Sequence, residues 1–334
     1  MKVPDTVGFA EPGTDKFTVR EQAALARKAE ETGFDWVLVP ETWGRDAFNR
    51  TGYIAAFVDS VTLGTGIVPV HSRSPALIAQ SIATLDEVAS GGAVLGLGLS
   101  SNYVIENWHG MEFSPGLRRQ RETIEIVRQA LSGEPVEYDG EVFDLEHFRM
   151  RFEPNPDIPI CVGAQGPINC EMTGGFADIW WPNRIPLSTM DRLREHVDRG
   201  ARKQDREPSE VETIPFATTC VLEDGERARD CGREEIAHYI GAMGDYTLEA
   251  LEAHNFAETA RAVNDHWEAG DKEAARAAVS DELLDEITVT GTPEKAAETI
   301  ERYAEATDGL VILPSKASSM SELEETLENI GALF

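Results

Sequence analysis

Three side chains that could take part in catalysis follow predicted strands of this 334-residue chain. Glu41 and Trp43 come directly after the apolar run FDWVLVP, and His71 follows the run GIVPV. A carboxylate or an imidazole at a strand end can transfer a proton, and an indole can stack on a flat ring. Each also has a structural interpretation, as an exposed carboxylate, a packing indole or a loop histidine. We take Glu41, Trp43 and His71 as the candidate catalytic residues.

The stretch VTLGTGIVPVHSRSP, residues 61–75, combines a strand, a loop and the start of a helix. Gly64 and Gly66 stand at alternate positions of the strand, which indicates close approach of either backbone or a ligand. Ser74 and Pro75 fit the N-cap and the first residue of a helix. Units of this kind bind ligands in α/β proteins, although a buried strand with packing glycines is the alternative.

The rest of the chain alternates between short apolar runs and segments of helical periodicity. The runs predict strands at 7–10, 34–40, 61–68, 93–99, 158–163, 178–182, 211–222 and 309–314. Alternating residues around Asp139-Gly140 predict a small antiparallel excursion. Residues 226–284 are almost wholly helical, and we expect an insertion after strand seven with Tyr239 in its core; a separate helical domain is the alternative. Eight strand and helix units predict one α/β domain over 1–334, a (β/α)8 TIM barrel.

In such a barrel the functional site lies at the carboxyl ends of the strands. Many residues there are small, which leaves room for a flat ligand and exposes backbone N–H groups. Arg184 and Lys316 fall where barrel enzymes often hold a phosphate. The expected wall consists of Glu11, Glu41 to Trp43, Gly66, Ile67, His71, Gly98 to Asn102, Gly163 to Pro167, Asn183, Arg184, Ser315 and Lys316.

The composition excludes several classes of partner. With 60 acidic and 30 basic residues the formal net charge is -30, which opposes binding to nucleic acid or to anionic membranes. This acidic surface, with few lysines, suits a cytosol of very high salt. The four cysteines show no metal-binding spacing and are expected to be small buried residues. Without an apolar leader or a membrane-length run, we expect a soluble cytoplasmic protein.

Several segments together carry a resemblance to a known family. LDE at 85–87 precedes SGG at 90–92 and VLGLG at 94–98; GEPVEYDGEVFDL at 133–145, IPICVGAQGP at 158–167 and FADIW at 176–180 follow. As a set, and in this order, they resemble the bacterial-luciferase-like superfamily over most of residues 5–185. The resemblance implies a (β/α)8 barrel that binds FMN or the deazaflavin coenzyme F420. It points to the F420-dependent branch that includes methylenetetrahydromethanopterin reductase, and to a homodimer in a halophilic archaeon.

The resemblance also implies positions for the cofactor. The Gly66-Ile67 bond would be a cis peptide behind the ring, Glu41 and Thr42 would face the ring edge, and residues 163–167 would make backbone contacts. The cofactor-binding residues expected on this basis are Thr42, Gly66, Ile67, Gly98, Ser100, Asn102, Gly163, Ala164, Gln165, Gly166, Pro167 and Arg184. Ala93 departs from the Arg or Lys common after the double glycine, and Thr42 stands where the sugar-phosphate dehydrogenase branch has a histidine.

These features predict an F420-dependent oxidoreductase that transfers a hydride between the deazaflavin and a small organic substrate. In this interpretation Glu41 exchanges the accompanying proton, and Trp43 and Ile67 form walls of the site. No metal is expected. An FMN-dependent monooxygenase of the same superfamily and a non-catalytic flavin-binding protein are the alternatives.

Overall fold

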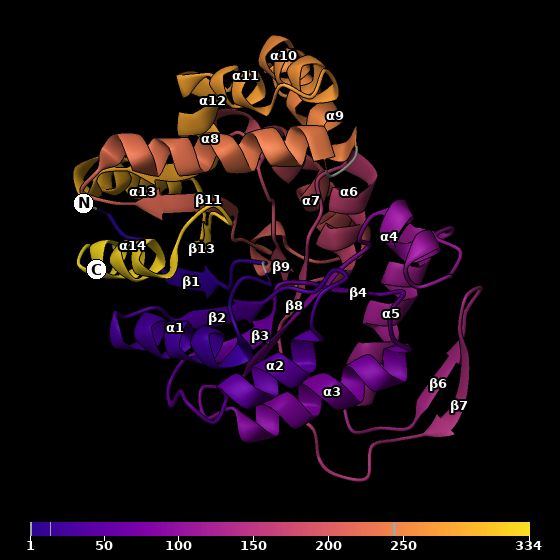
Figure 1. The fold of residues 1–334 in the computed structure, drawn as a ribbon. Helices are drawn as coiled ribbons and strands as arrows, with labels where there is room; N and C mark the ends of the chain where they lie inside the picture. The colour runs from indigo at the N-terminus through magenta and orange to yellow at the C-terminus, as the bar shows by residue number, and fades with distance from the viewer. Residues whose placement is uncertain (1, 14, 243–244) are drawn as a thin grey trace.

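A parallel sheet curls through the centre of the molecule in the computed structural model, which describes residues 2–13, 15–242 and 245–334 (Figure 1). Its hydrogen-bonded order is β10-β9-β8-β5-β3-β2-β1-β13-β11-β12, and β4 pairs with β5. The strands are β1 (Thr6–Ala10), β2 (Trp36–Val39), β3 (Thr62–Thr65), β4 (Val68–Pro69), β5 (Ala93–Gly98), β8 (Ile160–Val162), β9 (Ile179–Trp180), β10 (Glu212–Thr213), β11 (Phe216–Val221), β12 (Thr288–Gly291) and β13 (Gly309–Pro314).

Along residues 212–216 the β9–β10 end of this order meets β13 and the start of β11. The N–H of Ile214 donates to Trp180 O at 3.0 Å, and the N–H of Phe216 donates to Pro182 O at 2.8 Å. On the other side the N–H of Val311 donates to Pro215 O at 2.8 Å. The α/β class and the curled parallel sheet of a TIM-barrel fold therefore agree with the sequence prediction.

Helices cover the outside of the sheet, and polar caps explain where several of them begin. Thr18 and Glu21 form a capping box at α1, and Ser74 caps α3, in which Pro75 is the first residue, as the sequence predicts. The outer helices are α1 (Val19–Glu31), α2 (Ala47–Ile54), α3 (Pro75–Val88), α4 (Asn102–Asn107), α5 (Gly116–Leu131), α6 (Pro167–Phe176), α7 (Met190–Lys203), α13 (Pro293–Ala306) and α14 (Met320–Gly331).

The described residues between β11 and β12 form five further helices. They are α8 (Gly225–Ala242), α9 (Asp245–Ala253), α10 (Ala257–Glu268), α11 (Lys272–Ala277) and α12 (Asp281–Ile287). In Figure 1 α8 runs along β11, and the other four pack beyond it. Ile236, Ile240 and Leu283 belong to an apolar core separate from that of the barrel. Tyr239, predicted to lie in this core, instead faces a cavity described below.

Two strand predictions needed correction. Residues 211–222 form two strands, β10 and β11, because the chain bends at Ile214 and Pro215 and Pro215 has no N–H to donate. The segment 288–291 is an unpredicted strand, β12, which pairs in parallel with β11. The predicted antiparallel excursion is confirmed as β6 (Val136–Asp139) and β7 (Asp144–Phe148), which project from the body in Figure 1.

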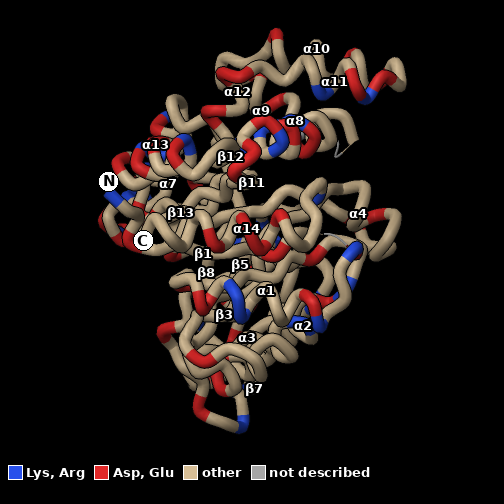
Figure 2. Tube along the Cα trace, turned by 60° about the vertical axis from the view of Figure 1, so that its left-hand side comes forward, with Lys and Arg blue, Asp and Glu red and all other residues tan. Residues whose placement is uncertain are grey.

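Acidic residues outnumber basic ones two to one along the chain. Figure 2 shows Asp and Glu spread over many outer helices, with fewer Lys and Arg between them. All four cysteines are buried and free, as predicted.

No helix in the described part of the chain is long and apolar enough to cross a membrane. The same residues contain no group of three or more His, Cys, Asp or Glu arranged to hold a metal.

Candidate functional site

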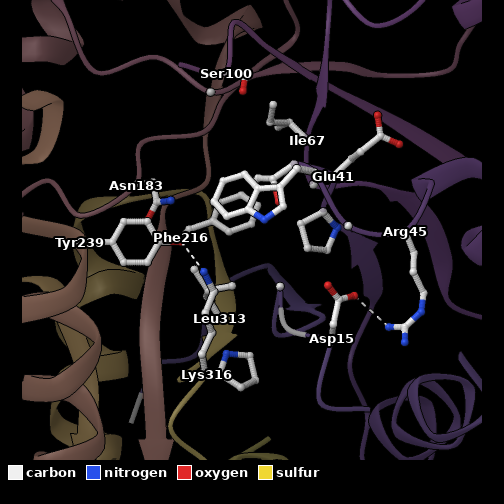
Figure 3. Close-up of a pocket in the computed structure, with 18 of the residues that line it drawn as sticks. Asp15, Glu41, Arg45, Ile67, Ser100, Asn183, Phe216, Tyr239, Leu313 and Lys316 are labelled. Carbon is white, nitrogen blue, oxygen red and sulfur yellow. Dashed lines mark hydrogen bonds and ion pairs between the residues drawn. The ribbon is translucent and has the colours of Figure 1, made fainter. Parts of the chain in front are cut away.

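A cavity of about 280 Å³ lies at the carboxyl ends of the strands (Figure 3). Its wall takes residues from the ends of β1, β2, β3, β5, β8, β9 and β13 and from α8. The lining residues are Gly13, Asp15, Pro40, Glu41, Thr42, Trp43, Gly44, Arg45, Arg50, Gly66, Ile67, Ser100, Gly163, Trp181, Asn183, Phe216, Glu235, Tyr239, Leu313, Pro314 and Lys316. A site at this end of the sheet is what the barrel fold predicts.

Asn183 and Lys316 of the expected wall line this cavity, as do seven of the predicted catalytic and cofactor-binding residues. These seven are Glu41, Thr42, Trp43, Gly66, Ile67, Ser100 and Gly163. They come from the ends of four adjacent strands, β2, β3, β5 and β8, so they share one side of the wall. The indole of Trp43 is 53% exposed, which leaves it available to a bound ring.

The Gly66-Ile67 peptide bond is cis, as the resemblance implies. The N–H of Gly66 donates to Val39 O at 2.9 Å, and Ile67 O accepts from the N–H of Glu41 at 3.1 Å. A Cβ on Gly66 would lie 2.9 Å from the Cβ of Leu38, closer than real side chains approach. Close packing against β2 therefore requires glycine here.

Glu41 forms a two-pronged ion pair with Arg73. The Arg73 Nη1 and Nη2 donate to Glu41 Oε1 and Oε2 at 2.6 and 2.8 Å, and the N–H of Ala47 donates to Oε2 at 2.8 Å. Arg73 also pairs with Asp46. The hydrogen bonds that Arg73 donates to the Glu41 carboxylate raise the pKa of Arg73. In Figure 3 the Glu41 carboxylate points away from the labelled residues of the far wall. Both oxygens are thus held by the protein, which favours positioning over proton transfer.

Glu11 and Arg50 form a second, deeper ion pair. Arg50 lines the cavity, and its Nη1 lies 3.1 Å from Oε2 of the fully buried Glu11. The other oxygen, Oε1, has no hydrogen-bond partner among the described residues. Burial raises the pKa of Glu11 to about 7, against the opposing attraction of Arg50. Glu11 is therefore a carboxyl group near the cavity that can change protonation close to neutral pH.

His71 is not brought to the cavity. Its side chain is buried, Nε2 lies 2.9 Å from Phe113 O, and the ring stacks on Phe113 with centroids 5.3 Å apart. Burial lowers the pKa of His71, so the ring is held neutral. The loop interpretation of this histidine, rather than the catalytic one, fits these contacts.

Gly98 and Asn102 also lie outside the cavity lining. A Cβ on Gly98 would lie 2.5 Å from Cδ1 of Ile67, so this glycine makes room for a protein side chain. Asn102 is exposed as the first residue of α4, and its Oδ1 accepts from the N–H of Tyr103 at 2.9 Å. The sequence does not distinguish packing against Ile67 from packing against a ligand.

The GAQGP segment reaches the cavity only through Gly163. Ala164 is buried and its carbonyl accepts from Trp180 Nε1 at 2.8 Å, while Gln165 Nε2 donates to Asn183 O at 2.6 Å. Gly166 is the N-cap and Pro167 the first residue of α6, and both are exposed beyond the lining. The segment thus fixes the loops after β8 and β9 relative to each other.

Arg184 lies behind the cavity wall, with Tyr239 in front of it. Its guanidinium carbon stands 3.3 Å from the centroid of the Tyr239 ring, and Nη2 is 3.6 Å from Glu235 Oε1. From the cavity side Lys316 Nζ donates to the Tyr239 hydroxyl at 3.2 Å (Figure 3). Burial raises the pKa of Tyr239, but the charges of Arg184 and Lys316 outweigh it and leave the pKa below its ordinary value.

Some of these residues were missed in the sequence, or assigned to another role. Tyr239 and Glu235 sit four residues apart on α8, which is the spacing of one helix face. That spacing does not tell whether the face meets a core or a cavity. Asp15, Arg45 and Arg50 follow the first two strands, but they carried no motif.

Comparisons with known proteins define the class to which this geometry belongs. Residues 5–308 match the luciferase-like monooxygenase family. The chain is 31% identical over 284 residues to 5,10-methylenetetrahydromethanopterin reductase of Archaeoglobus fulgidus, covering 83% of this chain and 84% of that protein. The chain therefore belongs to the luciferase-like monooxygenase family.

Two further similarities lie within the same range of proteins. The F420-dependent glucose-6-phosphate dehydrogenase of Nakamurella multipartita is 29% identical over 228 residues, 64% of this chain and 67% of that one. The structure of the coenzyme F420 dependent tetrahydromethanopterin reductase of Methanopyrus kandleri superposes with a TM-score of 0.84 at 22% identity, over 99% of this chain and 98% of the other. At this identity the superposition shows the shared fold.

Proposed function

We propose that this protein is a coenzyme F420-dependent oxidoreductase acting on a small organic substrate. The observation that carries the proposal is the cavity at the strand ends, bounded on one side by the cis Gly66-Ile67 peptide, in a chain whose relatives are named for F420. When bound there, the deazaflavin would supply two-electron hydride chemistry. The remaining steps belong to the side chains.

The residues of the cavity suit a flat ring with polar edges. Trp181 Nε1 and Asn183 Oδ1 are buried in the lining without hydrogen-bond partners among the described residues. One is a donor and the other an acceptor, which matches the N–H and C=O groups of a pyrimidine-like edge. A Cβ on Gly163 would meet nothing closer than 3.9 Å, so space remains beside it. Thr42, Ile67 and Ser100 would complete the walls.

For the proton that accompanies hydride transfer we propose Glu11 in place of Glu41. Glu41 has both oxygens engaged by Arg73 and Ala47, whereas Glu11 retains a free Oε1 and a pKa of about 7. A group that titrates near the working pH is suited to exchange a proton. Arg50, in contact with both Glu11 and the cavity, would keep the carboxyl in place.

Several wider properties belong to the same proposal. The five helices α8 to α12 are an insertion after the seventh strand that covers the substrate end of the cavity. The acidic composition supports a cytoplasmic enzyme of a halophilic archaeon, and the resemblance noted in the sequence implies a homodimer. Light scattering in 2 M KCl tests the dimer, for which a mass near twice 36.7 kDa is expected.

The function is tested by titrating the purified protein with F420 and separately with FMN in high salt. Binding of F420 with weak or no binding of FMN supports the proposal, and loss of the 420 nm absorbance of the coenzyme with a substrate demonstrates hydride transfer. Tight FMN binding together with oxygen consumption would contradict the proposed function and support the FMN-dependent monooxygenase alternative. F420 binding without turnover across a panel of alcohols, aldehydes and reduced pterins would leave a binding protein.

A further inference from the structure

Three cationic side chains of the described residues line the cavity, and their surroundings differ. Arg45 Nη1 lies 3.1 Å from Asp15 Oδ1, and Arg50 is paired with Glu11. Lys316 has no carboxylate within ion-pair distance in the described part of the chain. Its Nζ lies 3.2 Å from the Tyr239 hydroxyl and 4.9 Å from the centroid of the Tyr239 ring. Lys316 therefore presents an uncompensated positive charge to the cavity.

The protein places a second cation behind the same tyrosine. Arg184 is 4% exposed, and its Nε and Nη2 have no hydrogen-bond partner among the described residues. The nearest carboxylate, Glu235, is 3.6 Å from Nη2, and its Oε2 accepts the backbone N–H of Lys316 at 3.1 Å. Two cations and one carboxylate leave a local surplus of one positive charge inside a chain of net charge -30. Burying such a surplus is costly unless an anion compensates it.

We propose that Lys316 and Tyr239, backed by Arg184, form a subsite for an anionic group of the substrate, a carboxylate or a phosphate. The Lys316 ammonium and the Tyr239 hydroxyl donate to the anion, and Arg184 supplies positive potential through the ring. This subsite rests on the proposed function, because it orients a substrate toward the ring site on the opposite wall. It narrows the substrate class to small organic anions.

The position favours the substrate over the coenzyme as the source of this anion. Tyr239 and Glu235 come from α8, whereas the predicted ring site lies on the side of β2, β3, β5 and β8. The coenzyme carries its phosphate on a long acidic tail that must lead to solvent. Arg184 is almost completely buried, and Tyr239 on α8 is half-buried. This enclosure suits a short anionic group of a substrate.

The test is calorimetric titration of inorganic phosphate and of acetate into the purified protein at constant ionic strength, with and without saturating F420. We expect one phosphate or acetate site in both states. Lys316→Met should weaken it by at least about tenfold, the usual effect of losing one charge-assisted hydrogen bond, and Tyr239→Phe should weaken it by less. The matched control is Lys272→Met, since Lys272 is exposed and lies over Trp267 away from the cavity.

A spectroscopic measurement separates a binding role from a purely structural one. Bound phosphate neutralises Lys316, so the alkaline absorbance transition of Tyr239 at 295 nm should move to higher pH in the wild type and be absent in Tyr239→Phe. If phosphate binding were equal in wild type and a folded Lys316→Met, the subsite would be refuted. If F420 displaced phosphate competitively, the anion would belong to the coenzyme and the substrate assignment would be overturned. F420 affinity, measured in the same samples, reports on the proposed function separately.

Discussion

At the scale of single residues, the two acidic groups at the ends of β1 and β2 have opposite surroundings. Glu41 forms an ion pair through both oxygens with Arg73, whereas Glu11 is buried and one of its oxygens has no hydrogen-bond partner among the described residues. The sequence places both at strand ends and cannot separate them, because their partners Arg73 and Arg50 are 32 and 39 residues away. The structure favours the less conspicuous carboxyl for proton exchange.

Replacement of Glu41 by Gln tests its positioning role. The change leaves Asp46 as the carboxylate partner of Arg73, and a largely buried ion pair that loses one partner costs about 2 kcal/mol of stability. Urea unfolding should show this loss, and the double variant Glu41→Gln with Arg73→Gln should lose less than the two single variants added together. If the Glu41→Gln protein had unchanged stability but no turnover, Glu41 rather than Glu11 would be the residue that exchanges the proton.

Glu11→Gln tests the raised pKa. The native pKa of about 7 exceeds the ordinary 4.5, so between these values the folded state holds more protons than the unfolded state. Stability from this group is fully present below pH 4.5 and is lost as pH rises through 7. Relative to the variant, the free energy of unfolding of the wild type should fall by about 3 kcal/mol as the pH rises from 4.5 to 7.

The same variant should also change catalysis. Turnover of Glu11→Gln should fall, and its pH profile should lack a transition near pH 7. Equal pH profiles in stability and turnover for the two proteins would remove Glu11 from proton exchange and would mean that it is ionised in the native state.

At the scale of elements, β3 and β5 pack so closely that only glycine fits at two positions between them. A Cβ on Gly96 would lie 2.1 Å from Thr65 O, and one on Gly64 would lie 2.3 Å from Val94 O. The glycine spacing in the sequence predicted close approach correctly but left its cause open. The structure identifies neighbouring backbone as the cause at these positions.

Gly98→Ala is expected to disturb the ring site indirectly. Its Cβ would lie 2.5 Å from Ile67 Cδ1, so Ile67 must shift within the wall of the cavity. We expect a stability loss of about 1 to 3 kcal/mol and weaker F420 binding, measured by urea unfolding and coenzyme titration. Gly52→Ala is the control, because its Cβ meets nothing within 4 Å in α2 and the change should be neutral or stabilising. If Gly98→Ala bound F420 with unaltered affinity, Ile67 would not be part of the coenzyme site.

The elements that sequence reasoning identified are those with a strong local signal. Continuous apolar runs predicted β2, β5 and β13, and the cap at Ser74 predicted the start of α3. The bend at Pro215 and the four-residue β12 depend on which strands lie beside them, so periodicity does not reveal them. For the same reason the cavity face of α8, with Tyr239, was predicted to be core.

At the scale of the whole molecule, net charge dominates the response to solvent. With a formal charge of -30 the compact state repels itself, and salt shortens the Debye length from about 10 Å at 0.1 M to about 3 Å at 1 M. The thermal midpoint should rise from 0.1 to 2 M KCl, measured by circular dichroism. An equal concentration of sucrose controls for solvent effects without ions. A midpoint that falls with KCl would show that ion pairs such as Arg227–Glu322 outweigh the repulsion.

Strand β11 has different neighbours on one side along its length. Around Phe216 the chain pairs with the segment after β9, but from Thr218 onward it pairs with β12 instead. Past that divergence, the side wall that holds Tyr239 and Lys316 is built from α8 and the loop after β13. Amino-acid changes there can alter which molecules enter without sacrificing bonds between strands. Under the proposed function, changes in this sector would alter the choice of substrate and leave the wall formed by β2, β3, β5 and β8 intact.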